Sequence, residues 1–486
     1  MPATVTDPVS GPAHDRRTWA RRLARLDRRR VGAVVATLWF VVVLIVGPQG
    51  SLDAPASRML AIFGAAVVLW ITEAVPLAAT SIFVILAQIL LISDEAIVGL
   101  PATFETPTYE SIFATLADPV LMLFLGGFVL ADAATRYGLD RNLAGVMLRP
   151  FGTSPRSIVA GLMCITALLS MFVSNTATTA AMMAVVLPVA AGLDATDRLR
   201  VALVLSVPVA ANIGGIGTPV GSPPNAIVIG RLSQRGERVD FLQWMVLAVP
   251  VALVVLVVAW FVLTRLYPTD TTRLEIRLGG AFDRSRSAVL LYVVFGLTVL
   301  GWVTEPVHGV PAGIVGFTPV VVLMATGVVG VDDLKRINWH ILWLVGGGIA
   351  LGNGVADTGL DGWFVDRLDW GSMTSVAFAF ALAAAAWGLS TVISNSATAN
   401  LVAPIGIGIA ASGVVDLAPL LVGVIIAMTC SLAMALPIST PPNAVAYASG
   451  QVETRDLARV GLIVGAVGTV LVAAVAPPIW QALGLV

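Results

Sequence analysis

Residues 157–193 read SIVAGLMCITALLSMFVSNTATTAAMMAVVLPVAAGL, an apolar stretch that has no charged side chain and carries the polar tripeptide Ser174-Asn175-Thr176 near its centre. A near copy, Ser394-Asn395-Ser396, lies 220 residues later inside a second apolar stretch. Polar side chains are costly in a long apolar segment, so a repeated pair of them indicates a binding site. A lone tripeptide would be equally compatible with a structural role.

Each tripeptide is followed by a second signature, Gly221-Ser222-Pro223-Pro224-Asn225 after the first and Ser439-Thr440-Pro441-Pro442-Asn443 after the second. The offset is 220 residues for the tripeptides, 218 for these pentapeptides and 221 for the glycine pairs Gly126-Gly127 and Gly347-Gly348. Unrelated apolar runs do not hold register over three landmarks. We therefore predict that the two halves of the chain are related by duplication.

The composition predicts an all-α polytopic membrane protein in contact with the lipid bilayer. Of 486 residues, 57% are hydrophobic and only 12% are charged, which is too few to cover a soluble globule. The formal net charge of -1 provides no basic field, so we expect no nucleic-acid partner. Cys164 and Cys430 lie in apolar runs and predict packing, and no metal site can be assembled from the three histidines, of which His340 is expected at a membrane boundary.

An arginine-rich arm, residues 1–30, precedes the first apolar run. No clean cleavage site follows it, so we predict a retained first helix, a cytoplasmic N-terminus and about eleven transmembrane helices in the plasma or inner membrane. The first four helices are expected near residues 31–47, 59–75, 78–92 and 116–135. Most basic loops satisfy the positive-inside rule. Four arginines depart from it: Arg58, Arg231, Arg235 and Arg238.

The two apolar stretches, residues 157–193 and 373–411, are predicted to be re-entrant hairpins. Half of such a stretch reaches roughly 25 Å, short of a bilayer crossing of about 30 Å. Arginines flank the first stretch on both sides, whereas mainly aspartates flank the second. The hairpins therefore enter from opposite faces, as an inverted-topology repeat requires.

Clusters of Gly and Pro interrupt the helix that follows each hairpin. In the first half, residues 214–219 and Pro223-Pro224 break a helix that begins near Val201, and the equivalent break is expected at residues 437–442. Freed carbonyl oxygens suit a small hard cation, and helix N-termini suit an anion.

The expected site has no fixed counter-ion for an anion. Residues 201–230 carry no charge, and Asp416 is the only charged residue between Asp369 and Glu453. A bound anion then needs an accompanying cation, and sodium suits hydroxyl, amide and carbonyl oxygens. A proton-coupled site would need Asp, Glu or His in these segments.

These motifs resemble the divalent anion/sodium symporters, a family that imports dicarboxylates, citrate or sulfate. The resemblance covers nearly the whole chain after the arginine arm and includes the early motif Trp70-Ile71-Thr72-Glu73-Ala74-Val75-Pro76-Leu77. It implies an elevator transporter, usually a homodimer, whose transport domain slides against a scaffold. The implied parts are a cytoplasmic arm (1–30), scaffold segments (31–156 and 288–372), transport segments (157–265 and 373–486) and a cytoplasmic linker (266–287).

The resemblance also implies roles for single residues. One sodium site would comprise Ser170, Ser174, Asn175 and the Gly221 carbonyl, and its repeat mate Ser390, Ser394, Asn395 and the Ser439 carbonyl. The substrate would meet Asn175, Thr176, Ser222 and Pro223 from one half and Asn395, Ser396, Thr440 and Pro441 from the other. Ser396 stands where dicarboxylate carriers often have Thr, and it keeps the hydroxyl.

The leading hypothesis is sodium-coupled symport of a C4-dicarboxylate such as succinate, malate or fumarate, with citrate or sulfate as other substrates. A second is a sodium-independent dicarboxylate exchanger of the same fold. A third, a membrane-embedded enzyme, would need a nucleophile with a base or a metal, and no His, Cys, Asp or Glu lies near Ser174 or Ser394 in the sequence. We therefore predict that the protein is not an enzyme.

Three further patterns favour structural roles. Asp132 and Arg136 have the i,i+4 spacing of an ion pair on a helix. Glu73 precedes a proline at a helix end and is interpreted as an interfacial structural carboxylate. The glycine runs favour close helix packing over a phosphate cradle, since no Lys-Ser/Thr follows them.

Overall fold

The computed structural model describes residues 13–274, 282–367 and 373–485, with the side chains of residues 13–28 and of Arg141 outside the description. Apart from one isolated bridge between Gln49 and Leu52, the regular elements in these ranges are helices. Nine helical segments of the described residues are long and apolar enough to cross a membrane, and five shorter helices are also apolar. The all-α, multi-pass architecture is therefore confirmed.

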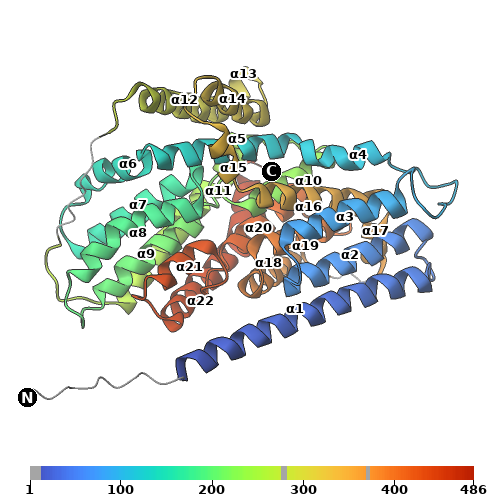
Figure 1. Ribbon diagram of the computed structural model, residues 1–486, viewed down its shortest axis with the longest axis horizontal. Coiled ribbons are helices and arrows are strands. Elements are labelled where there is room, and N and C mark those ends of the chain that lie inside the picture. The colour runs from blue at the N-terminus through green and yellow to red at the C-terminus, as the bar shows by residue number, and fades with distance from the viewer. Residues whose placement is uncertain (1–12, 275–281, 368–372, 486) are drawn as a thin grey trace, which may run out of the picture.

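The first half runs from blue to green in Figure 1. Its helices are α1 (Ala13–Val46), α2 (Ala54–Thr72), α3 (Leu77–Ile92), α4 (Tyr109–Ala114), α5 (Pro119–Arg136), α6 (Leu139–Met147), α7 (Pro155–Phe172), α8 (Asn175–Ala191), α9 (Leu199–Gly214), α10 (Pro223–Gln234) and α11 (Phe241–Leu266). Helix α1 begins within the predicted arm, and residues 1–12 of that arm lie outside the described residues. Helix α2 begins five residues earlier than predicted, because Asp53 accepts the Ala56 N–H at 2.9 Å as an N-cap.

The second half runs from yellow to red in Figure 1. Its helices are α12 (Arg286–Val303), α13 (Glu305–His308), α14 (Ala312–Ala325), α15 (Val331–Arg336), α16 (Trp339–Asp357), α17 (Leu360–Arg367), α18 (Ser375–Val392), α19 (Asn395–Ala411), α20 (Pro419–Ser431), α21 (Pro441–Ala448), α22 (Thr454–Val470) and α23 (Ala476–Ala482). A π-helical turn, Leu471–Val475, joins the last two. The linker between the halves is described only in part, since residues 275–281 lie outside the description.

Each apolar stretch folds as a helix pair that turns at its polar tripeptide. Val173 and Ser174 are non-helical and separate α7 from α8. Ile393 and Ser394 do the same between α18 and α19. The two helices of each pair contact one another. We call Ser174-Asn175-Thr176 the first tip and Ser394-Asn395-Ser396 the second tip.

The helix after each pair is interrupted, as predicted, but the proline pairs do not lie in the break. Helix α9 ends at Gly214 and α10 begins at Pro223, whereas α20 ends at Ser431 and α21 begins at Pro441. The second break therefore starts before residue 437, where we expected it. Proline suits the first helical position because that position has no N–H to satisfy and requires the φ that proline already has. Each Pro-Pro pair thus starts the helix beyond the break.

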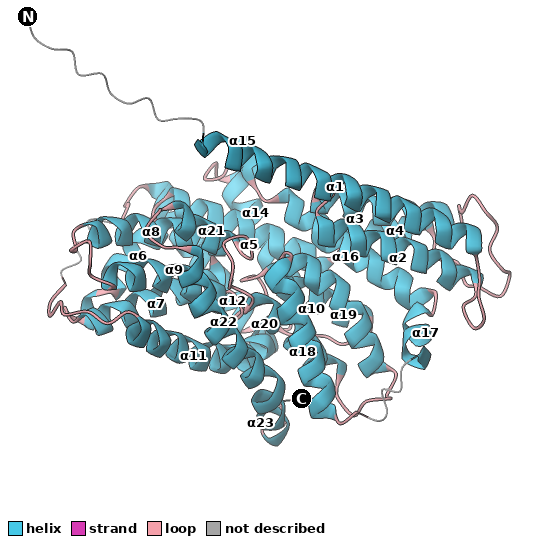
Figure 2. Ribbon diagram, turned by 90° about the horizontal axis from the view of Figure 1, so that it is seen from below, coloured by secondary structure: helices cyan, strands magenta, loops and turns pink. Residues whose placement is uncertain are grey.

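In each half, the helix that follows the break packs against the other half of the molecule. Helices α7 and α8 pack on α9, and α18 and α19 pack on α20, which is the repeat. Helix α10 continues from α9 but packs on α19 and α20, and α21 continues from α20 but packs on α8 and α9. Figures 1 and 2 show α21 beside α8 and α9 in both views. Neither half closes its own core, so the breaks of both halves meet in one place.

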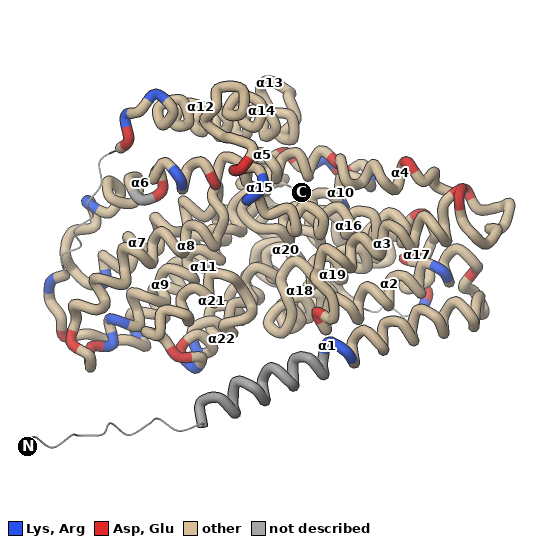
Figure 3. The backbone as a smooth tube through the Cα atoms, viewed as in Figure 1, with Lys and Arg blue, Asp and Glu red and all other residues tan. Residues whose placement is uncertain are grey.

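Charged residues gather at helix ends and loops, and α8, α19 and α20 carry none (Figure 3). The predicted pair of Asp132 with Arg136 is wrong. Arg136 instead contacts Asp333 of α15 at 2.7 Å, and Asp132 lies 3.9 Å from Arg336. Helical spacing brings two side chains within reach of each other, but here α15 offers each a partner from another helix.

Three of the four arginines that depart from the positive-inside rule are held by the protein itself. Arg58 donates to three carbonyls at the end of α3 and in the loop after it, each at 2.8 Å. Arg235 contacts Asp361 at 2.5 Å, and Arg231 is only 3% exposed. The rule is a statement about loop charge, and these side chains are not free loop charges.

The glycine pairs permit close helix packing, as predicted. A Cβ added at Gly126 would overlap the carbonyl of Gly316 in α14, and a Cβ added at Gly347 would overlap Ser81 in α3. Only hydrogen fits at these crossings. They hold together a wall of α3, α5, α14 and α16, in which α5 contacts α8 and α16 contacts α19.

Candidate functional site

A cavity of about 410 Å³ lies where both tips meet both breaks, within the size range of small-molecule sites. All eight residues expected at the substrate line it: Asn175, Thr176, Ser222, Pro223, Asn395, Ser396, Thr440 and Pro441. Four more expected sodium ligands line it as well: Ser174, Gly221, Ser394 and Ser439. Ser170 and Ser390 lie behind the tips, and each contacts the asparagine of its own tip. The structure thus brings together residues that lie about 220 positions apart.

Three oxygen atoms cluster behind the first tip. Ser170 is fully buried on α7, and its Oγ lies 2.5 Å from Asn175 Oδ1 and 2.9 Å from the Ala211 carbonyl oxygen. A hydroxyl carries one proton and can donate to only one of these two oxygens. The remaining contact joins two oxygens with no hydrogen between them. A cation among the three oxygens would stabilise this arrangement.

The second half repeats this cluster. Ser390 Oγ lies 2.8 Å from Asn395 Oδ1 and 3.0 Å from the Cys430 carbonyl oxygen. The serine again precedes its asparagine by five residues and is again fully buried. In each cluster, therefore, one hydroxyl proton faces two acceptor oxygens. Both clusters adjoin the cavity.

The asparagine that follows each proline pair holds the break in place. Asn225 Nδ2 donates to the carbonyl oxygens of Gly215 at 2.9 Å and Thr218 at 2.8 Å. Asn443 Nδ2 donates to those of Met434 at 2.7 Å and Leu436 at 3.0 Å. Both asparagines are fully buried. Because a buried carbonyl is costly when unpaired, these amides fix which carbonyls stay free for a ligand.

Glycines keep the first break close to its tip. A Cβ added at Gly215 would lie 2.5 Å from Asn175 Nδ2, 2.8 Å from its Oδ1 and 2.9 Å from the Gly221 carbonyl oxygen. A Cβ added at Gly221 would lie 2.6 Å from the Gly215 carbonyl oxygen. The tip amide and the Gly221 carbonyl thus converge on a space that a methyl group would fill. Two of these three atoms, Asn175 Oδ1 and the Gly221 carbonyl oxygen, are neutral oxygens of the kind that a small hard cation prefers, and the third is the amide nitrogen of Asn175.

Two polar residues at equivalent positions link the halves across the site. Asn212 of α9 donates to Thr440 Oγ1 at 3.1 Å and to Asn443 Oδ1 at 3.2 Å. Ser431 of α20 lies 3.2 Å from Ser222, oxygen to oxygen. Neither residue was predicted from the sequence. Their signal was uncharged polarity inside apolar helices at an offset of 219 residues, close to that of the tips.

The opposite wall of the cavity comes from helices α3, α5 and α16. It is largely apolar, with Leu77, Phe124 and Phe128 among its residues, but the start of α16 adds Asn338 and His340. Neither was predicted at the site. His340 is the only titratable side chain among the residues that line this cavity. The sequence held no signal for it, since it lies in no repeated motif.

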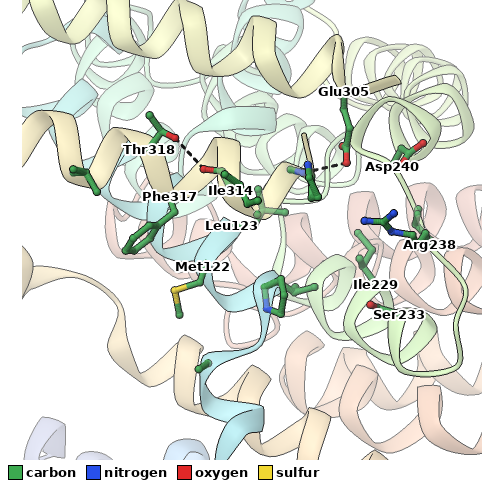
Figure 4. Close-up of a pocket in the computed structure, with 18 of the residues that line it drawn as sticks. Met122, Leu123, Ile229, Ser233, Arg238, Asp240, Glu305, Ile314, Phe317 and Thr318 are labelled. Carbon is green, nitrogen blue, oxygen red and sulfur yellow. Dashed lines mark hydrogen bonds between the residues drawn. The ribbon is translucent and has the colours of Figure 1, made fainter. Parts of the chain in front are cut away.

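A larger cavity of about 670 Å³ lies between α5, α10 and α14 (Figure 4). Apolar residues such as Met122, Leu123 and Phe317 line most of it. At one end Glu305 already accepts the N–H groups of Phe241 and Ala312, at 3.2 and 3.1 Å. It contains none of the paired repeat residues, and its two carboxylates, Asp240 and Glu305, outnumber its one cationic side chain, Arg238. We therefore place the site in the smaller cavity.

Comparison with known sequences finds one family over nearly the whole chain. Residues 28–486 match the family model of the sodium:sulfate symporter transmembrane region. The sodium-dependent dicarboxylate transporter SdcS of Staphylococcus saprophyticus is 29% identical, over 91% of this chain and 89% of the relative. SdcS of Staphylococcus aureus is 28% identical with the same coverage. These are names of transporters, so the enzyme hypothesis is rejected.

Comparison with solved structures finds the same fold at low identity. The YdaH transporter of Alcanivorax borkumensis aligns with a TM-score of 0.56 at 12% identity, over 84% of this chain and 99% of that one. MtrF of Neisseria gonorrhoeae, an antimetabolite efflux pump, aligns with a TM-score of 0.51 at 13% identity, over 90% and 96%. At such identity the likeness concerns the fold alone.

Proposed function

The chain belongs to the sodium:sulfate symporter family, and we propose that it is a secondary transporter that imports a C4-dicarboxylate, such as succinate, malate or fumarate, together with sodium. The named relatives support a dicarboxylate, because both are sodium-dependent dicarboxylate transporters. The cavity supports a small anion, since hydroxyl and amide donors from both tips converge on it.

The observation that carries this proposal is the repeated oxygen cluster. Ser170 with Asn175 and Ser390 with Asn395 each place three oxygens around one proton, beside a cavity with no acidic or basic side chain other than His340. Two sodium ions at these clusters would neutralise a dianion between the tips. Substrate and sodium would then bind together, which is the basis of symport.

We further propose an elevator movement. The two helix pairs with their broken helices would form the transport domain, and the wall of α3, α5, α14 and α16 would belong to the scaffold. The helix pairs would be re-entrant from opposite faces, as their flanking charges predict. The family resemblance supports a homodimer in the plasma or inner membrane with its N-terminus in the cytoplasm.

Uptake of labelled fumarate into proteoliposomes tests this function. An inward sodium gradient should drive accumulation, whereas potassium or choline should not. Uptake that is equally fast without sodium would reject symport. Preloaded unlabelled fumarate distinguishes the exchanger, because exchange persists without sodium only in that case.

Competition by unlabelled anions then defines the substrate. Succinate, malate and fumarate should each inhibit uptake, whereas citrate and sulfate should inhibit weakly. Stronger inhibition by citrate or sulfate would assign the protein to that substrate instead. The cavity of about 410 Å³ admits all of these anions, so this choice depends on donor placement.

A further inference from the structure

One side chain of the substrate cavity belongs to neither repeat motif. His340 lies in the first turn of α16, on the wall that faces the tips, and its side chain is exposed to the cavity. Its imidazole makes no hydrogen bond within the described part of the chain. The other residues that line the cavity are apolar or neutral polar. A change in the charge of this cavity between pH 5 and 8 can therefore come only from His340.

The charged side chains nearest to the start of α16 already pair with one another. On α5 these are Asp132 and Arg136, and on α15 they are Asp332, Asp333, Lys335 and Arg336. Arg136 contacts Asp333 at 2.7 Å, Lys335 contacts Asp332 at 2.8 Å, and Arg336 contacts Asp333 and lies 3.9 Å from Asp132. Three acidic and three basic groups sum to zero, so they do not offset the charge of an imidazolium.

Two of the remaining elements packed against α16 adjoin a carboxylate. Helix α2 ends at the exposed C-cap Glu73, four residues before Leu77, which lines the cavity with His340. The turn Thr115–Ala117, which is followed by Asp118, packs against Gly346 of α16.

Helices α3 and α19 have no charged residue. Arg231 of α10 lies against Gly352, about 18 Å along α16 from His340 at 1.5 Å per residue. The contacts of Arg58 on α2 and of Asp361 on α17 lie at the same far end. His340 is thus the single titratable side chain among the residues that line the cavity.

We propose that His340 is a substrate-binding residue supplied by the wall opposite the tips, and that its protonated form tightens the hold on a dicarboxylate. This inference rests on the proposed function and adds a residue to it. A bound dianion stabilises the imidazolium, so by linkage protonation favours binding. Affinity is then highest at pH values where the imidazole is protonated in the free protein and falls as the pH rises.

The experiment measures fumarate affinity in saturating sodium between pH 6 and 8.5, by calorimetry on the purified full-length protein. Carboxyl groups ionise near pH 4, so fumarate stays a dianion over most of this range. The wild type should lose about three- to tenfold in affinity as the pH rises, which corresponds to a pKa change of half to one unit. His340→Gln, which keeps an N–H donor but does not titrate, should bind fumarate with the same affinity at every pH.

A matched control separates this effect from general effects of pH. His308 lies in α13 outside the cavity, with its ring bonded to the Gly301 carbonyl and the Val310 N–H, so His308→Gln should keep the wild-type profile. A pH profile that survives in His340→Gln overturns this inference and leaves the proposed function intact. Absence of sodium-dependent fumarate binding in the wild type at every pH overturns both.

Discussion

The two halves of the molecule share their tips but differ in the breaks that face them. The serine and asparagine contacts behind each tip match to within a few tenths of an ångström. In the break, however, the first half has Gly215 and Gly221 where the second has Ala433 and Ser439. The glycines bring backbone oxygens closer to the tip amide than side chains would allow. The comparison indicates equivalent oxygen clusters behind the tips but unequal breaks beside them, so the two cation sites should differ on the side of the break.

The link between the halves is also unequal. Asn212 reaches both Thr440 and Asn443, whereas its repeat mate Ser431 is shorter, reaches Ser222 across the site and donates to the Ala427 carbonyl of its own helix. As a result, Asn443 Oδ1 has a donor, while the buried Asn225 Oδ1 has none among the described residues. An unpaired buried oxygen beside the first break strengthens the expectation that this half holds its cation differently.

The largest expected effect tests what the halves share. Asn175→Ala and Asn395→Ala should each reduce sodium-driven fumarate uptake by about 100-fold, because each removes an anion donor and a cation ligand together. Uptake in proteoliposomes measures this. Asn142→Ala, outside the cavity on α6, is the matched control and should transport normally. Wild-type uptake in either tip variant would remove that tip from the site.

The next effect tests how the halves differ. Gly215→Ala should raise the sodium concentration for half-maximal uptake about tenfold or more, since overpacking costs about 1–3 kcal/mol. The reverse change at the equivalent position, Ala433→Gly, should alter it less than about threefold, because it removes a methyl group that the site already accommodates. Equal sodium dependence in the two variants would contradict the inequality of the cation sites.

The free energy of unfolding should fall by different amounts when the asparagine that holds each break is replaced. Asn443→Ala should lower the free energy of unfolding by about 2–3 kcal/mol, because two carbonyls lose their donor and the Asn212 amide loses one of its two acceptors. Asn225→Ala should cost about 1–2 kcal/mol, since its Oδ1 has no donor to lose. Denaturation of the purified protein in detergent, without sodium or substrate, compares them. A larger loss for Asn225→Ala would show that Asn225 supports the first break through a further partner.

The smallest effect concerns the links across the site. Asn212→Ala should cost about 1–2 kcal/mol, whereas Ser431→Ala should cost about 0.5 kcal/mol, since a single hydroxyl contact in a membrane protein contributes little. The same denaturation assay measures both. Equal losses would mean that Ser431 supports more than its contact with Ser222.

Much of the site could be predicted because the same polar motifs occur in both halves of the sequence. Polar tripeptides in uncharged apolar stretches identified the tips, and Gly and Pro clusters identified the breaks. The position of the second break was predicted less accurately, because α20 already ends at Ser431 and the prolines begin α21. Proline both breaks a helix and starts one, and only the preceding residues decide which.

The misses share a physical cause. Asp132 and Arg136 have helical spacing, yet their partners lie on α15, and His340 reaches the cavity only because α16 lies opposite the tips. Local spacing limits which neighbours a side chain can have, whereas packing between distant helices decides which it does have. The repeated motifs indicated which distant residues meet at the tips, whereas nothing in the sequence indicated which residues of the wall face them.

An experimental structure with sodium and fumarate bound tests most directly whether the two tips share one anion site. We expect anion density between Asn175 and Asn395, in contact with both tips, and cation density beside Ser170 and Ser390. Anion density at one tip alone, or an anion held by Arg238 in the larger cavity, would contradict it.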